Sequence, residues 1–188
     1  MYKFMAMVIT VMLSTAGVGQ EVNPGARTVI ESGGRTVTFT EDVPKEHTGY
    51  DSPWHYAHAV RSGDYVHISG IIISADRDDE LPISMDRFRE HTEDRFEVIQ
   101  RFLATADASL EDIVKINTFH VLDGKNTTLT IDEQALAIAE TKAKYAIEPH
   151  PAWTAVGTTG LFSPLGIVEI EMVAYAPLDG NEDGQLER

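Results

Sequence analysis

The sequence predicts an α+β domain in which two helices cover one face of a mixed sheet. Apolar residues make up 43% of the 188-residue chain, which is enough for the core of one domain with additions at its ends. From about residue 50 onward, strand and helix patterns follow in the order β-β-α-β-α-β-β. Long helices placed between strands in this way pack as a second layer on the sheet.

The domain is expected at residues 47–177 and opens with a β-hairpin. Residues 57–60 and 65–68 have strand patterns, and Ser62-Gly63-Asp64 between them has the composition of a turn. An extension of residues 21–46 precedes the domain. Within it, residues 35–40 alternate with the period of a strand.

Two helices follow the hairpin. The first is predicted over residues 85–106, and a capping box at Ser109 and Asp112 then starts one short turn. A second capping box, at Thr130 and Glu133, starts a helix that runs to residue 145 and ends before two prolines. The first helix carries these residues at the spacing of an inward face: Phe88, Thr92, Arg95, Phe96, Ile99, Phe102, Leu103 and Ala106.

Three more strands complete the sheet. They are predicted at residues 113–122, between the helices, and at residues 153–158 and 168–175. Alternation places five residues of the first of these strands on one face: Val114, Ile116, Thr118, His120 and Leu122. The acidic tail, residues 178–188, is polar and is expected to be disordered.

Composition excludes several classes of function. Lys and Arg number 15 against 30 Asp and Glu, for a net charge of −15, and nucleic acid is not expected as a partner because phosphate binding needs clustered cations. The chain has no cysteine, which excludes disulfides, thiolate catalysis and cysteine-ligated zinc.

The N-terminus has the pattern of a secretory signal. Lys3 is followed by an apolar run at residues 4–13 and by small residues at 14–19, so residues 1–20 are expected to be a signal peptide. The apolar run is too short to span a bilayer, and no stable membrane anchor is expected. The alternative is an N-terminal strand or buried helix of a cytosolic protein. The signal interpretation predicts a periplasmic or secreted protein.

Three sequence blocks carry a resemblance to a known family. They are YAHAV at residues 56–60 with Ser69-Gly70, ASLEDIVK at residues 108–115, and PHPAWTAVG at residues 149–157 followed by GIVEIEMVA at residues 166–174. In this order and spacing they resemble the Rid (YjgF) family over about residues 50–177. The resemblance implies a chorismate-mutase-like fold, a homotrimer with small-molecule clefts between subunits, and an enamine or imine deaminase activity.

The resemblance also implies roles for individual residues. Tyr56 matches the family's cleft tyrosine, and Gly70 matches a glycine whose backbone lies near the ligand. Glu169 matches the glutamate that positions the attacking water; the alternative is a structural carboxylate in a strand. Ala155, next to Thr154, has a backbone N–H that could bind a carboxylate oxygen of the substrate.

Trp153 departs from the family pattern. The matching position in the deaminases is an arginine that clamps the substrate carboxylate, whereas an indole offers one N–H and an apolar face. Trp153 is therefore either a core aromatic or a cleft wall that stacks on a flat ligand. Arg61 lies in the hairpin and is expected to face solvent, so it offers no obvious substitute.

The resulting functional prediction has two forms. The first is hydrolysis of a small imine, enamine or unsaturated amine other than 2-iminopropanoate, with Glu169 and Tyr56 as the catalytic residues. The second is a non-catalytic ligand-binding or scaffold protein of the same fold. No cofactor is expected. A metal site is disfavoured, because His55 and His58 have helical spacing in an extended segment and no HExxH motif is present.

Overall fold

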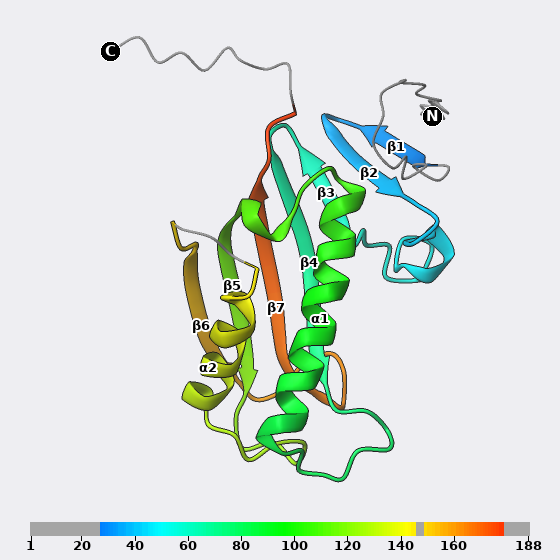
Figure 1. Cartoon of the computed structure of the whole chain (residues 1–188). Helices are drawn as coiled ribbons and strands as arrows, with labels where there is room; N and C mark the ends of the chain where they lie inside the picture. The colour runs from blue at the N-terminus through cyan, green and yellow to red at the C-terminus, as the bar shows by residue number, and fades with distance from the viewer. Residues whose placement is uncertain (1–26, 146–148, 179–188) are drawn as a thin grey trace, which may run out of the picture.

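The computed structural model describes residues 27–145 and 149–178 (Figure 1). The expected signal peptide, the first residues of the extension and nearly all of the acidic tail lie outside these ranges. The strands are β1 (Thr28–Ser32), β2 (Arg35–Phe39), β3 (Ala59–Ser62), β4 (Tyr65–Ser74), β5 (Ile113–Val121), β6 (Ala152–Thr158) and β7 (Gly166–Tyr175). The helices are α1 (Met85–Thr105), α2 (Ile131–Lys142) and two short 3₁₀ turns, η1 (Lys45–His47) and η2 (Leu110–Asp112).

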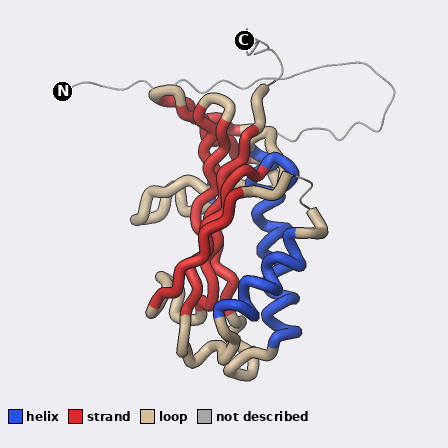
Figure 2. The backbone as a smooth tube through the Cα atoms, turned by 90° about the vertical axis from the view of Figure 1, so that its left-hand side faces the viewer, coloured by secondary structure: helices blue, strands red, loops and turns tan. Residues whose placement is uncertain are grey.

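All seven strands join one mixed sheet in the order β1-β2-β3-β4-β7-β5-β6. β5 and β6 are parallel, and the other neighbours are antiparallel. Both long helices lie on one face of the sheet (Figure 2). The predicted α+β architecture is therefore confirmed.

The N-terminal extension contributes more to the sheet than the sequence predicted. β1 was not predicted; it pairs with β2 across a two-residue turn at Gly33 and Gly34, whose φ angles of 59° and 71° suit glycine. β2 then pairs with the end of β3 through Arg35 and Thr36. Residues 28–39 thus extend the edge of the domain sheet.

Capping side chains start both helices where the sequence indicated. The Ser84 hydroxyl accepts a 3.2 Å hydrogen bond from the Arg87 N–H at the start of α1. Thr130 and Glu133 form the predicted capping box of α2. The helix itself ends at Lys142, three residues before the predicted end.

The core lies between the helices and the sheet. Its fully buried members come from α1, α2, β4, β5 and β7 and include Phe88, Phe96, Ile99, Leu103, Ile138, Ile73, Ile116, Ile170 and Met172. Each side chain of this size contributes about 1.5–3 kcal/mol by leaving water. This packing fixes α1 along β4 and β7 and leaves the other sheet face without helices.

The prediction for β5 was correct at its centre and wrong at its ends. Ile116, Thr118 and His120 are buried as predicted, but Val114 is 43% exposed and Leu122 is 40% exposed. A register shift between residues 113 and 115 lets Ile113 take the inward position instead. Leu122 follows the last residue of the strand.

The helix-free face of the sheet exposes large apolar side chains. Tyr65 and Tyr175 are cross-strand partners, their rings 5.3 Å apart, and each is nearly half exposed. Val156, on β6, is 44% exposed and lies opposite Phe119 of β5. Among the described helices, none is long and apolar enough to cross a membrane.

Candidate active site at the edge of β4

The candidate site lies where β4 extends past its neighbour β3. The last β3–β4 pair is Ala59 with Ile68, and the Ser69 N–H donates to the His58 carbonyl. From Gly70 onward, β4 has no strand partner on this side within the described residues. A hollow of about 300 Å³ opens there, between β4, α1 and the loop before β3. Its lining includes Tyr56, His58, Gly70, Ile71, Arg95 and Phe102.

Glu169 lies on β7, on the helix-free face of the sheet, next to Gly70 of the hollow. It lies opposite Ile72 of β4, and its carboxylate is packed against Gly70. A Cβ atom at position 70 would fall 1.8 Å from Oε1, so only glycine leaves room for the carboxylate in this place. Burial, and next the negative charge of Glu171, raise the pKa of Glu169 above its ordinary value.

Tyr56 forms the outer wall of the hollow. Its ring packs on Gly49, where a Cβ atom would lie 1.9 Å from the ring, and its backbone N–H donates to the Gly49 carbonyl. The Ser52 hydroxyl donates to the same carbonyl, which holds the loop closed. Figure 1 shows this loop projecting beside α1. The Tyr56 hydroxyl has no hydrogen-bond partner in the described part of the chain.

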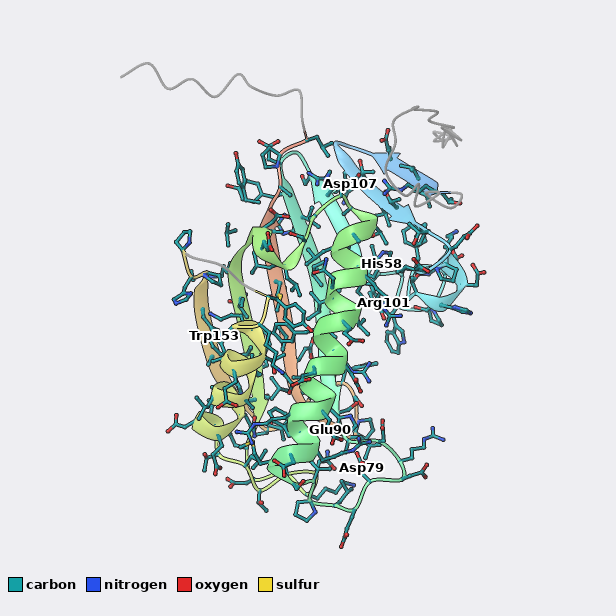
Figure 3. All side chains as sticks on the ribbon, in the orientation of Figure 1. His58, Asp79, Glu90, Arg101, Asp107 and Trp153 are labelled. Atoms are coloured by element: carbon teal, nitrogen blue, oxygen red, sulfur yellow. The ribbon has the colours of Figure 1, made fainter. Side chains whose placement is uncertain are left out.

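His58 lies at the inner wall and is almost fully buried (Figure 3). Its Nε2 is 3.2 Å from the Thr105 hydroxyl, which itself donates to the Phe102 carbonyl. Burial lowers the pKa of His58 to about 4, so the imidazole is neutral near pH 7. The sequence suggested His58 only as an unlikely metal ligand.

Trp153, Thr154 and Ala155 lie on β6, at the opposite edge of the sheet from the hollow. Figure 3 shows Trp153 and His58 on opposite sides of the molecule. The structure therefore divides the residues that the sequence grouped into one site. Tyr56, Gly70 and Glu169 come together, and the β6 residues cannot reach them within one chain.

Trp153 belongs to the helix side of β6 and is half-buried. Its indole N–H donates a 2.9 Å hydrogen bond to the Thr118 hydroxyl, and the Lys142 ammonium lies 5.7 Å from its ring centre. Thr154 and Ala155 are exposed. In this position the tryptophan contributes packing within its own chain, and its single donor is already used.

The hydrogen bond of Trp153 belongs to a buried polar chain. Thr118 contacts His120 Nε2 at 2.8 Å, and His120 Nδ1 contacts the Gln134 amide oxygen at 2.9 Å. The Gln134 amide nitrogen donates to the Leu129 carbonyl, which leaves its oxygen to accept from Nδ1–H. These hydrogen bonds require the neutral tautomer with its proton on Nδ1. Burial lowers the pKa of His120, which favours this neutral form.

One expectation about arginine was wrong, and one arginine was missed. Arg61 was expected to face solvent but is buried. Its guanidinium donates hydrogen bonds to the Ala106 and Ala176 carbonyls, which satisfy it there. Arg95 of α1 lines the hollow. The signal for it was present in the sequence, since an arginine stood within the inward-facing spacing of a helix whose other inward positions are mostly apolar.

The histidines considered as a metal site do not converge. His55 lies in the exposed loop, whereas His58 is buried beside the Thr105 hydroxyl. A different group, Asp76, Asp79 and His91, has ligand atoms within 4.8 Å of one another. There, however, the Arg87 guanidinium already bonds to both aspartates. Backbone donation from Asp76, then bonds from His91 and Arg87, lower the pKa of Asp79, as in an ordinary ion-pair network.

A family profile and several known proteins match most of the chain. The family profile described as Endoribonuclease L-PSP matches residues 50–176, which leaves β1 and β2 outside. RutC family protein YjgH of Escherichia coli K12 is 30% identical over 126 residues, covering 65% of this chain and 83% of YjgH. The crystal structure of Rv2704 from Mycobacterium tuberculosis, a YjgF/YER057c/UK114 family member, has a TM-score of 0.54 at 25% identity and covers 76% of this chain and 99% of its own. A structure of YjgH has a TM-score of 0.51 at 26% identity, covering 69% and 88%.

Proposed function

The chain belongs to the Rid (YjgF) family, and we propose that it hydrolyses a small imine, enamine or unsaturated amine by water addition at the β4 hollow. The observation that carries this proposal is the Glu169 carboxylate held against Gly70 beside the hollow. Imine hydrolysis needs a water positioned next to the C=N carbon and a base that orients or deprotonates it. A carboxylate with a raised pKa is suited to both tasks.

The other lining groups complete the chemistry. The Tyr56 hydroxyl, free of partners among the described residues, can donate a hydrogen bond to the nitrogen that leaves. Neutral His58 and the apolar side chains of Ile71, Val98 and Phe102 form the inner part of the lining. No cofactor is needed for this reaction, because both the base and the hydrogen-bond donor come from the chain.

We propose that the working unit is a homotrimer. The family is typically trimeric, and two features of this chain support the same assembly. The helix-free sheet face carries the half-exposed side chains of Tyr65, Tyr175 and Val156. Contact with another subunit would remove this apolar surface from water and so stabilise the assembly. β6 is the last strand of the sheet, and β7 and β5 separate it from the β4 hollow. Contact between subunits would bring Thr154 and Ala155 of one protomer to the hollow of the next.

The substrate is proposed to differ from 2-iminopropanoate. In the deaminases of the family an arginine stands where this chain has Trp153, and that arginine clamps a carboxylate. The Trp153 N–H is committed to Thr118, so this position offers no charged donor for the substrate. What β6 still offers at a subunit interface is the exposed backbone of Ala155 and the Thr154 side chain.

A second candidate is a non-catalytic ligand-binding or scaffold protein. It is favoured by the same commitment of Trp153 to the packing of its own chain, which removes the usual substrate clamp. RNA cleavage, suggested by the name of the family profile, is disfavoured for this chain because its net charge is −15. Export to the periplasm or the medium is proposed from the signal pattern of residues 1–20.

A panel of imines tests the proposal. Imines with and without a carboxylate, formed in solution by amine and amino-acid oxidases, are mixed with the protein, and carbonyl formation is compared with the spontaneous rate. Glu169→Gln keeps the shape of the side chain and removes its charge, so it should abolish any acceleration. Light scattering on the same samples should give three times the protomer mass. Acceleration that survives in Glu169→Gln excludes Glu169 as the base, and no acceleration of any imine favours the binding protein.

A further inference from the structure

Arg95 is a cation without a counter-ion at the wall of the hollow. Acidic residues outnumber basic ones 30 to 15 in this chain, and three of its eight described arginines, Arg27, Arg87 and Arg89, form ion pairs. Arg95, in contrast, has no ion pair or hydrogen bond with any residue of the ranges 27–145 and 149–178. Its Nε is buried and unpaired. The guanidinium therefore has no anionic partner within ion-pairing distance among the described residues.

The sequence around Arg95 explains why it has no partner. The positions one helical turn away carry His91, Thr92, Val98 and Ile99, none of which is acidic. Val98 lines the hollow with Arg95, so this face of α1 turns toward the cavity. A guanidinium has five donors and no acceptor, and a buried donor without a partner costs stability. A ligand that brings an anion into the hollow would remove this cost.

We propose that Arg95 binds the carboxylate of the ligand, in place of the clamp that β6 lacks. This inference rests on the proposed function, because it takes the β4 hollow as the ligand site. A carboxylate accepts two parallel N–H bonds from a guanidinium, which is the strongest pairing that an arginine makes with a small acid. The apolar side chains of Ile71, Val98 and Phe102 surround the remainder of the ligand.

The position of Arg95 also specifies the ligand. Arg95 approaches the hollow from α1, on the helix side of the sheet, whereas Glu169 lies on the helix-free face, opposite Ile72. A carboxylate held at Arg95 thus stands away from the water held at Glu169. In 2-iminopropanoate the carboxylate and the reacting carbon are directly bonded. The ligand class is therefore a small acid whose reacting carbon is separated from its carboxylate by additional carbons.

Calorimetric titration of the full chain tests this assignment with a matched pair of probes. In 4-oxopentanoate a ketone stands for the C=N group two carbons away from the carboxylate, and 4-oxopentanamide replaces that carboxylate by an uncharged amide. We expect the acid to bind at least about tenfold more tightly than the amide. Arg95→Gln should remove this difference, and Arg95→Lys, which keeps the charge without the paired donors, should keep part of it.

Arg101→Gln is the control, since Arg101 is an exposed arginine farther along α1 that does not line the hollow (Figure 3). It makes the same charge change and should leave the preference for the acid intact. Equal binding of acid and amide, a preference that survives in Arg95→Gln, or no binding of either probe would overturn the assignment. Equal binding of the two probes leaves the hollow as a ligand site. An acid preference that depends on Arg95, with no imine hydrolysis dependent on Glu169, would retain this inference and refute the proposed reaction.

Discussion

The Glu169 carboxylate lies against Gly70, and a Cβ atom at position 70 would fall 1.8 Å from its Oε1 and 2.7 Å from its carboxyl carbon. The two residues are on neighbouring strands of the sheet, β7 and β4. The absent side chain at position 70 leaves the space that the carboxylate occupies, and Gly70 itself lines the hollow. The position of the proposed base thus depends on a residue that has no functional group.

Gly70→Ala tests this dependence without altering the carboxylate. Gly70 has no left-handed backbone angle, so alanine should be tolerated by the backbone, while its Cβ displaces the Glu169 side chain. We expect imine hydrolysis to fall at least tenfold, since about 1.4 kcal/mol of lost positioning is enough. Gly160→Ala is the control, because nothing lies within 4 Å of a Cβ there. An unchanged rate in Gly70→Ala would show that this contact does not position the base.

The raised pKa of Glu169 is a second expectation. Its ordinary value is 4.5, and burial first, then Glu171, raises it. Carbon-13 NMR of the Glu169 carboxyl should therefore show a titration midpoint above 4.5. Glu171→Gln removes the neighbouring charge and should move that midpoint down, while burial keeps part of the elevation. A midpoint that is insensitive to Glu171→Gln would contradict the electrostatic contribution.

The polar chain from Trp153 to Gln134 should contribute to stability. Thr118→Val removes the hydroxyl that joins the indole N–H to His120 and leaves buried polar groups unpaired, at a cost of about 1–3 kcal/mol each. Thr118→Ser keeps the hydroxyl and should cost less. Urea unfolding of both variants at neutral pH measures the difference. Equal destabilisation would mean that the loss comes from packing and not from hydrogen bonding.

The sequence predicted most of the fold because periodicity and capping are local. The α1 spacing and the Thr130–Glu133 capping box are each readable within a few residues, and each was found in place. β1 and the exposed position of Val114 were missed. A hairpin added to a sheet edge and a register shift in a central strand both depend on distant partners, which leave only weak local signals.

The site was less accessible to sequence reasoning. Tyr56, Gly70 and Glu169 were identified by their places in family blocks, and the structure brings these three together. Trp153 was grouped with them because the blocks carry no information about which strand edge each residue occupies. Arg95 stands outside all three blocks. Its inward position on α1 was readable from the helical spacing, but a role in the site is suggested only by the hollow and by the lack of an ion pair among the described residues.

Export of the protein is a further prediction, based on the apolar run of residues 4–13 and the small residues after it. Intact mass measurement of the protein from its natural source should give a mature N-terminus near Glu21. Detection of the chain with Met1 or its immediate neighbours still attached would contradict export through this segment. Expression with residues 1–20 deleted provides the mass standard for the comparison.

In the proposed function Glu169 activates the water, and Trp153 in place of the arginine excludes 2-iminopropanoate as the substrate. The most direct measurement is the rate at which the unmodified protein hydrolyses 2-iminopropanoate, beside a family member that has arginine at the matching position. Loss of a paired arginine–carboxylate contact costs a few kcal/mol, so we predict a rate lower by about a hundredfold or more. An equal rate in the unmodified protein, lost in Glu169→Gln, would contradict the role assigned to Trp153.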